Sequence, residues 1–251
     1  MNILMNNARA IEVKNISHFF VEEEKSIHAL EGISFAVKKG EFFTILGPSG
    51  CGKSTLLRIV AEMVKPTRGE VNFSEESENK ALSMIFQSFA IFPWLTVFEN
   101  VGFGLSMRGI SDHERLAIVK EHIKEIGLMG FEHVYPKDLS GGMKQRVGIA
   151  RALAMNPKIL LMDEAFSSLD SFIAAKLRAE VLDLWLKDKM TIIAVTHLVN
   201  EAVEMSDRIL VMTPIPGKVE AILDINLPRP RDQRSPEFFK LVDRLNEIVK
   251  I

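Results

Sequence analysis

The chain has 251 residues, and 31 lysines and arginines against 33 aspartates and glutamates give it a formal net charge of −2. With 47% hydrophobic and 25% charged residues, this composition is typical of a globular protein with a substantial core, and it argues against general disorder and against a basic nucleic-acid-binding surface. A single cysteine excludes an intramolecular disulfide and fits a reducing compartment. We expect one large domain, or a domain with a sizeable inserted lobe.

Neither a secretion signal nor a membrane span is expected. Residues 1–12 have no apolar stretch of signal-peptide length. Residues 81–98 carry no charge over eighteen positions, but a spanning helix needs roughly 20 mostly apolar residues. The run contains the polar residues Ser83, Gln87, Ser88 and Thr96 and, in its middle, Pro93. We therefore reject the transmembrane alternative and expect the chain by itself to be soluble.

The first part of the chain predicts strands followed by a helix. Residues 10–20 and 28–37 are β-like runs separated by turns, and residues 42–46 are a short apolar run that ends in a glycine-rich loop, as a buried strand would. Beyond the loop, apolar side chains recur at helical spacing until Pro66, which ends the predicted helix. These apolar positions are Leu56, Val60, Met63 and Val64.

Further helices and strands follow. Ser111 and Glu114 have the spacing of a capping box and begin a helix that stops near Gly127. Residues 159–162 and 191–195 are short runs of buried-strand type, and an amphipathic helix is predicted between them. The apolar positions of the two helices are Leu116, Val119, Ile123 and Ile126, and Ile173, Leu177, Val181 and Leu184.

This alternation predicts the fold class. Strands that alternate with helices imply parallel pairing and an α/β core. The stretch from about residue 88 to 156 is poor in strand patterns, so we expect a helical lobe inserted in that core. The tail from Pro228 contains PRPR and a final amphipathic helix ending at Ile251, and we expect an accessory element there rather than a second domain.

Residues 47–54 match the phosphate-loop pattern G-x-x-x-x-G-K-[ST] between a predicted strand and a predicted helix. Glycines let consecutive N–H groups turn inward, and the helix N-terminus adds partial positive charge, so that a polyphosphate is held. Lys53 is expected to reach the β- and γ-phosphates, and Ser54 to offer a hydroxyl to Mg²⁺. The alternative, an ordinary glycine-rich turn, is disfavoured by the context of strand and helix.

Cys51 lies inside this loop. A thiol near a helix N-terminus can be reactive, but we favour the simpler interpretation that the cysteine fills a variable loop position. If the loop binds nucleotide, Mg-ATP should protect Cys51 from alkylation.

Asp163 and Glu164 follow directly on the predicted strand at 159–162. Ligands bind at the carboxyl ends of strands in open α/β sheets. We expect Asp163 to hold Mg²⁺ and Glu164, on the other face, to act as general base toward the attacking water. The alternative is an ordinary acidic loop after a strand. It is disfavoured because the same chain contains a phosphate loop.

A second glycine signature, LSGGMKQR, occupies residues 139–146 and opens a helix with Ser140 as a plausible N-cap. Two glycines in a first turn cost roughly 1 kcal/mol each if counted as interior positions. A plain cap needs neither glycine, and both make sense if backbone N–H groups must approach an anion.

Together with GPSGCGKST at 47–55 and ILLMDE at 159–164, this motif resembles the signature of the ATP-binding subunits of ABC transporters. The resemblance covers residues 11–232 as one ATP-binding domain. It implies a P-loop NTPase core with an N-terminal antiparallel β subdomain and an inserted α-helical subdomain at about 88–156, followed by an accessory helix at 233–251. The ATP-binding residues that it implies are Gly47, Pro48, Ser49, Gly50, Cys51, Gly52, Lys53, Ser54, Thr55 and Phe20.

The same resemblance implies a head-to-tail homodimer. Ser140 and Gly142 of one subunit would touch the γ-phosphate held by the other's Lys53, and Asp170 in SSLD matches the D-loop across the dimer. The signature positions expected at the opposite subunit's ATP are Ser140, Gly141, Gly142 and Gln145.

Three single residues match further family positions. Gln87 in MIFQ matches the Q-loop, which senses Mg²⁺ and water and reports to the membrane partner, so that the implied metal ligands are Ser54, Gln87 and Asp163. His197 in VTHL matches the switch histidine that contacts the γ-phosphate. Phe20 fits the aromatic side chain that stacks on adenine, with Phe19 as a competitor. Gln87 and His197 could otherwise be ordinary solvated loop residues.

A finer resemblance is to the nitrate, sulfonate, taurine and bicarbonate group of importers, through FPWLTVFENVGFGL, GFEHVYP and LPRPR. It implies that residues 92–95 receive a coupling helix of the permease, whereas the alternative buries Trp94 in the helical lobe. The sequence departs from the family at Glu62, Ala165, Ser167-Ser168 and Leu198, which affects turnover and coupling geometry rather than the reaction.

The sequence therefore predicts an ATPase that uses ATP and Mg²⁺ to energise the import of a small, anionic solute. The expected catalytic residues are Glu164, His197, Lys53 and Gln87. The expected partners are a second ATPase subunit, two transmembrane permease subunits and, indirectly, an extracytoplasmic solute-binding protein, with no nucleic acid. We expect a peripheral position on the cytoplasmic face of the cell membrane. The alternatives are a soluble ABC ATPase of DNA repair or translation, and a non-catalytic module that keeps ATP for assembly.

Overall fold

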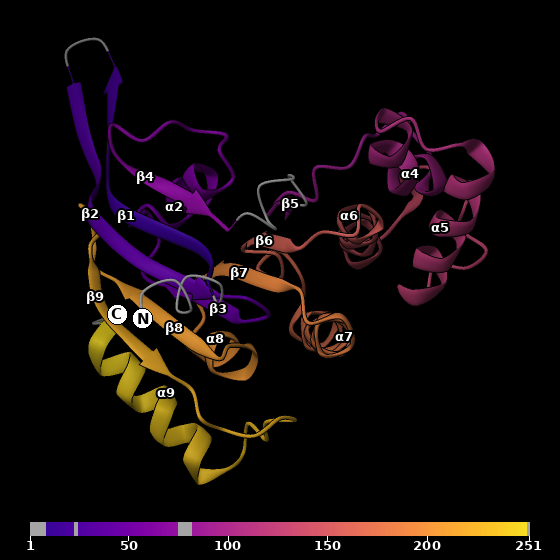
Figure 1. Ribbon diagram of the computed structural model, residues 1–251. Coiled ribbons are helices and arrows are strands. Elements are labelled where there is room, and N and C mark those ends of the chain that lie inside the picture. The colour runs from indigo at the N-terminus through magenta and orange to yellow at the C-terminus, as the bar shows by residue number, and fades with distance from the viewer. Residues whose placement is uncertain (1–8, 23–24, 75–81, 250–251) are drawn as a thin grey trace. The chain divides into compact units, whose positions relative to one another are not determined.

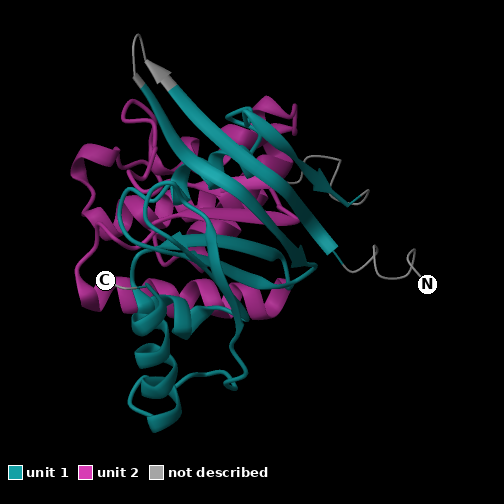
Figure 2. Cartoon of the chain, turned by 90° about the vertical axis from the view of Figure 1, so that its left-hand side faces the viewer, with its two compact units in different colours: residues 1–80, 189–251 teal, residues 81–188 magenta. Residues whose placement is uncertain are grey.

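The computed structural model describes residues 9–22, 25–74 and 82–249. The chain divides into two compact units, of which unit 1 comprises residues 1–80 and 189–251 and unit 2 residues 81–188 (Figure 2). Within the described residues, no helix combines the length and the apolar character needed to cross a membrane. The uncharged run tested above contributes to a short strand and to the first residues of a helix.

Three strands of unit 1 form an antiparallel sheet in the order β2-β1-β4 (Figure 1). They are β1 (Arg9–Glu22), β2 (Lys25–Lys38) and β4 (Arg68–Phe73). The first two contain the predicted β-like runs, which are thereby confirmed. Alternate side chains such as Ile11 and Val13 on β1 are buried, as the period of two in a strand with one covered face requires.

A second group of strands in unit 1 has the order β7-β3-β8-β9. These are β7 (Thr191–Thr196), β3 (Phe42–Leu46), β8 (Arg208–Met212) and β9 (Val219–Asp224). β3 pairs in parallel with β7 and β8, and β9 closes this edge antiparallel to β8. All residues of β3 and β7 are buried, which explains why both appear in the sequence as continuous apolar runs.

The helices of unit 1 are α2 (Lys53–Val60), α8 (Val199–Met205) and α9 (Pro236–Val249). The prediction that the first helix continues to Val64 is wrong. It ends at Val60, because Glu62 takes a left-handed conformation with φ +58° and Met63 turns into solvent. α9 confirms the amphipathic tail, and its predicted end at Ile251 lies outside the described residues.

The tail is joined to unit 1 by apolar packing and by two arginines. Phe238, Leu245 and Val249 of α9 pack in one core with side chains of α8 and β8. Arg231 donates to the carbonyl oxygens of Val203 (2.6 Å) and Ser206 (2.7 Å) at the end of α8. Burial, and to a lesser degree the neighbouring Arg229, lowers the pKa of Arg231 to about 10, so the side chain stays charged at neutral pH.

In unit 2, β5 (Leu82–Ile85) pairs in parallel with β6 (Ile159–Asp163). The helices are α4 (Val97–Met107), α5 (Asp112–Glu125), the 3₁₀ helix η1 (Pro136–Asp138), α6 (Gly141–Ala154) and α7 (Ser171–Asp188). α4, α5 and α6 bury one shared core that contains Val101, Ile123 and Val147.

The helix caps of unit 2 differ in part from the prediction. Ser111 caps α5 by accepting a hydrogen bond from the N–H of Glu114, whereas the reciprocal capping box occurs at Thr96 and Glu99 of α4. Leu116 is exposed, so its assignment to the apolar face of α5 is wrong. The predicted stop is confirmed, because Gly127 has φ +66° and its N–H donates to the carbonyl of Lys124.

α7 separates β6 from β7, as predicted. Leu177 and Val181 are buried, while Ile173 and Leu184 are only partly covered, because Ala174 and Trp185 complete the buried face. Helices α4 to α6 fall within the predicted helical stretch of residues 88–156, and the compact unit around them is longer because it also holds β5, β6 and α7. The assignment of one domain with an inserted lobe stays a prediction.

Candidate functional site

The phosphate loop joins β3 to α2 in unit 1. Gly50 and Gly52 have φ values of +80° and +96°, which L side chains rarely adopt, and Gly52 is the N-cap of α2. The helix has no side-chain cap and no acidic residue in its first turn. Its first N–H groups and its partial positive charge are therefore directed at the loop, as anion binding requires.

Lys53 is held against the loop itself. Its side chain is 4% exposed, and Nζ donates to the carbonyl oxygens of Gly47 (2.8 Å) and Pro48 (2.9 Å). The ammonium group is thus fixed beside the backbone that would surround a phosphate. Because a lysine ammonium has three donors, it can add a phosphate oxygen to these carbonyls or exchange one of them for it.

Cys51 is 1% exposed and packs inside the loop, close to Gly47. A reactive cysteine needs an accessible thiolate, so burial favours the interpretation that Cys51 fills space. Whether nucleotide protects it from alkylation stays a prediction.

The acidic strand end belongs to unit 2. Asp163 is the last residue of β6 and is buried, while Glu164 has φ +44° and is partly exposed. The structure brings Gln87 and Glu164 together, because Gln87 Nε2 donates to Glu164 Oε2 at 3.2 Å. An amide and a carboxylate at this distance can both contact one water molecule. This pairing gives the two side chains a shared location at the end of β6.

Ser167, noted in the sequence only as a departure from the family, joins this group. Its hydroxyl donates to the carbonyl oxygen of Glu164 at 2.9 Å, and its N–H donates to the same oxygen at 3.1 Å. Gln87 Nε2 lies 3.4 Å from the hydroxyl oxygen of Ser167. Ser167 therefore contacts both partners of the Gln87–Glu164 pair. The position of Ser167 three residues after Glu164 is the sequence feature from which this contact could have been predicted.

The signature residues are divided between surface and interior. Ser140 caps α6 by accepting from the N–H of Met143 (3.3 Å), and Ser140 and Gly141 are exposed. Gly142 is buried, and a Cβ there would lie 2.7 Å from Cγ2 of Ile173. Close packing against α7 therefore explains why residue 142 is glycine, and the sequence did not indicate this contact.

Gln145 requires a correction. The sequence grouped it with the residues that reach the opposite subunit's ATP, but its side chain is 0% exposed. Nε2 donates to the carbonyl oxygen of Ala165 at 2.5 Å, directly after Glu164. A fully buried side chain cannot touch a ligand on another subunit, so Gln145 acts within unit 2, where it ties α6 to the segment that follows β6.

Other predicted positions lie near the ends of elements. Asp170 accepts from the N–H of Ile173 at 3.0 Å and thereby caps α7. His197 follows β7 in unit 1 and is partly exposed. Phe20 on β1 is 42% exposed with its ring edge-on to His18, whereas Phe19 stacks on His28 at 4.0 Å. Phe20 is thus the more available of the two rings.

The aromatic cluster in unit 2 lies at the surface. Trp94 is 69% exposed, so the alternative that buries it in the helical lobe is wrong. Its ring lies 5.7 Å from that of Phe92, which also contacts Phe103 at 4.4 Å. Arg151 lies over the Phe92 ring at 5.6 Å. The cluster therefore offers an aromatic surface with a cation beside it.

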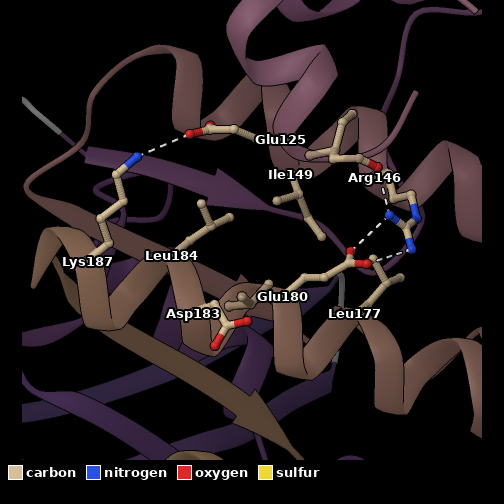
Figure 3. Close-up of a pocket in the computed structure, with 10 residues that line it drawn as sticks. Glu125, Arg146, Ile149, Leu177, Glu180, Asp183, Leu184 and Lys187 are labelled. Carbon is tan, nitrogen blue, oxygen red and sulfur yellow. Dashed lines mark hydrogen bonds and ion pairs between the residues drawn. The ribbon is translucent and has the colours of Figure 1, made fainter. Parts of the chain in front are cut away.

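The described residues of unit 2 also form a pocket of about 290 Å³ among α5, α6 and α7 (Figure 3). Arg146 binds Glu180 at 2.9 Å, and Lys187 binds Glu125 at 3.3 Å. Between these pairs lie the aliphatic side chains of Ile149 and Leu184 (Figure 3). Because its cations are paired with carboxylates, this pocket does not suit a polyphosphate.

Similarity to known proteins agrees with the motifs. Residues 30–167 match the protein family described as ABC transporter. The chain is 42% identical over 231 residues to the aliphatic sulfonates import ATP-binding protein SsuB of Bacillus cereus, with 91% of each chain covered. It is 38% identical over 252 residues to the nitrate import ATP-binding protein NrtD of Synechocystis sp., covering 96% of this chain and 95% of that protein.

Among solved structures, the dimeric ATP-binding cassette MJ0796 in a post-hydrolysis state bound to ADP and Pi superposes with a TM-score of 0.76. Its sequence is 35% identical, and the match covers 87% of this chain and all of that one.

Proposed function

The chain belongs to the ATP-binding proteins of ABC transporters and is an ATPase of that family, and we propose that it energises the import of a small anionic solute. Relatives named as sulfonate and nitrate importer subunits support the transport role and the class of solute. None of these relatives is a repair or translation factor, so the non-transport alternative has no support.

The observation that carries hydrolysis is the bond between Gln87 Nε2 and Glu164 Oε2. In the proposed mechanism both groups hold the attacking water, and Glu164 accepts its proton as the water oxygen bonds to the γ-phosphorus. The bond from the γ-phosphorus to the bridging oxygen then breaks, and ADP and phosphate leave. Lys53 and His197 stabilise the charge on the transferred phosphoryl group.

The donor set fits Mg²⁺ rather than a softer metal. Ser54, Gln87 and Asp163 offer a hydroxyl, an amide and a carboxylate oxygen, and Mg²⁺ prefers oxygen ligands. The described residues contain no cluster of three His, Cys, Asp or Glu side chains that would form a cage of their own. Mg²⁺ bound by few protein ligands and by substrate phosphates would supply neutralisation of the phosphate charge.

The assembly in this proposal is a homodimer docked on two permease subunits at the cytoplasmic face of the membrane, with a separate solute-binding protein outside. The dimeric structure of the MJ0796 cassette supports the dimer. The exposed Ser140 and Gly141 would face the partner's nucleotide, and the Phe92–Trp94 cluster would receive the permease. Gln145 is proposed to position the segment after Glu164.

The test is reconstitution with a permease that co-purifies with this chain, together with a solute-binding protein. ATP hydrolysis should increase when a sulfonate or nitrate is added together with the binding protein, and a neutral sugar should have no effect. Mg-dependent phosphate release by the isolated chain tests the ATPase separately. A complex that hydrolyses ATP but responds only to a neutral or cationic solute would overturn the solute class alone.

A further inference from the structure

The turn between β8 and β9, residues 213–218, contacts the back of the phosphate loop within unit 1. Gly217 donates its N–H to the carbonyl oxygen of Ala29 (2.9 Å) and accepts from the N–H of Glu31 (3.0 Å). These bonds hold Gly217 alongside β2, where it forms an isolated parallel bridge to Leu30. The position of the Gly217 backbone is therefore set by β2 and not by the turn alone.

Gly217 has no room for a side chain. A Cβ at this position would overlap the main-chain oxygen of Cys51 and would lie 2.5 Å from Cε of Met212. Its φ lies outside the left-handed region, so alanine is excluded by contact and not by backbone strain. The methionine end is flexible and could move aside. The Cys51 oxygen belongs to the phosphate loop, and it could move only together with the loop.

The residues around Gly217 also enclose the loop from other directions. A Cβ at Gly52 would lie 2.7 Å from Leu30 Cδ2 and 3.1 Å from the Ala29 carbonyl oxygen. A Cβ at Gly47 would lie 3.2 Å from the Met212 main-chain oxygen. β2, the end of β8 and the turn thus pack directly against three points of the phosphate-loop backbone.

The turn is braced internally. Thr213 Oγ1 accepts from the N–H of Lys218 (3.0 Å) and lies 3.2 Å from the carbonyl oxygen of Pro216. Lys218 Nζ binds Glu31 at 2.9 Å, which ties the turn to β2 a second time. A braced turn resists displacement, so it can act as a fixed stop for the loop.

We propose that Gly217 is a positioning residue for the phosphate loop: its missing side chain lets the loop sit deep enough against β2 to direct its N–H groups at a polyphosphate. The proposal rests on the proposed function in one respect, because it takes residues 47–54 as the ATP-binding loop. It adds a residue 166 positions away in the sequence that sets the geometry of that loop.

The test uses Cys51, the single cysteine of the chain, as a built-in reporter. In Gly217→Ala, displacement of the loop should raise the rate of Cys51 alkylation by N-ethylmaleimide about tenfold, as measured by mass spectrometry. The KM for ATP should rise by about the same factor while kcat changes less, because Gln87 and Glu164, which act on the attacking water, lie outside the displaced loop. Circular dichroism reports whether the variant is folded.

Gly109→Ala is the matched control, since Gly109 has φ +73° and open space around it, so that alanine there strains the backbone without touching the phosphate loop. It should leave alkylation and KM at the wild-type values. Thr213→Val removes the brace without adding bulk and should shift both readouts in the same direction by a smaller factor. If Gly217→Ala does not fold, the alkylation rate and the KM of Thr213→Val test the proposal in its place.

Wild-type alkylation and KM in a folded Gly217→Ala, or in Thr213→Val when the alanine variant is unfolded, would overturn the proposal. Failure of the wild-type chain to bind ATP would instead contradict the proposed function. In that case faster alkylation of Gly217→Ala would still support the contact between turn and loop.

Discussion

Lys53 in the phosphate loop is buried and bonded to two carbonyls of its own loop. Gln87, two residues beyond β5, is exposed, and its bonds to Glu164 and Ser167 are longer, at 3.2 and 3.4 Å. The loop is also packed against β2 and the β8–β9 turn, while Glu164 is held by its neighbours in the same short turn. A site that binds a polyphosphate gains from rigid donors, because no reorganisation is then needed on binding. Groups that act on water must change partners during each cycle, so weak and exposed contacts suit them.

If the phosphate loop serves binding and the Gln87–Glu164 pair serves hydrolysis, substitutions in the pair should lower kcat and leave ATP affinity intact, whereas substitutions in the loop should weaken ATP binding. Glu164→Gln should lower kcat for ATP hydrolysis about 1,000-fold, since it removes the proposed general base but keeps a hydrogen-bonding side chain of the same shape. ATP binding should persist, and size-exclusion chromatography should detect an ATP-dependent dimer. Near-normal phosphate release by this variant would eliminate Glu164 as the base.

Lys53→Ala, unlike Glu164→Gln, should weaken ATP binding as well as hydrolysis. Loss of the ammonium removes a positive charge that stabilises both the bound nucleotide and the transition state. We therefore expect kcat/KM to fall about 100-fold and ATP affinity to fall with it. Steady-state phosphate release and equilibrium binding of a fluorescent nucleotide measure both quantities. The exposed Lys65 provides the control, and Lys65→Ala should match the wild type. Unchanged affinity in Lys53→Ala would remove the distinction between the two regions.

Ser167→Ala tests the weaker contacts around Glu164. Its hydroxyl donates to the Glu164 carbonyl and lies within reach of Gln87, so its loss should lower kcat about fivefold, the equivalent of one hydrogen bond, with KM unchanged. Ser167→Thr keeps the hydroxyl and should restore kcat. Ser168→Ala alters the neighbouring exposed residue and should have no effect. Equal kcat values for the two alanine variants would speak against a role for Ser167.

The smallest effect is expected at Glu62, just beyond the end of α2. A left-handed conformation costs a non-glycine residue roughly 1–2 kcal/mol. Glu62→Gly should therefore raise the free energy of unfolding by about 1 kcal/mol, less the chain entropy that glycine adds. Glu62→Ala, which does not relieve the strain, should give no such gain. Urea unfolding measures both, and a loss of stability in the glycine variant would show that Glu62 is not strained.

Local patterns in the sequence predicted most of the elements. β3, β6 and β7 are continuous apolar runs because both faces are covered, and the phosphate loop is a contiguous motif between a strand and a helix. Ends of elements were predicted less well. α2 stops at Val60 because Glu62 leaves the helical conformation, although helical spacing of apolar residues continues to Val64.

Contacts between distant segments were not predictable. Gly217 contacts Cys51 across 166 positions, and nothing near Gly217 in the sequence indicates that contact. Gln145 lies in a motif associated with ligand contact, yet its side chain is buried and bonded to Ala165. Sequence spacing places such a residue on a helix, but only the packing of that helix decides whether the side chain faces solvent or the interior.

Two arginines of the PRPR segment have a consequence for the tail. Arg229 donates to the carbonyl oxygen of Met205 at 2.6 Å, and Arg231 to those of Val203 and Ser206, so the carboxyl end of α8 is capped by side chains that precede α9. Without them, carbonyl groups in a poorly hydrated location would lose their donors. The tail should therefore melt together with the rest of unit 1 in one cooperative transition, and a chain shortened to Leu227 would lose stability throughout that unit.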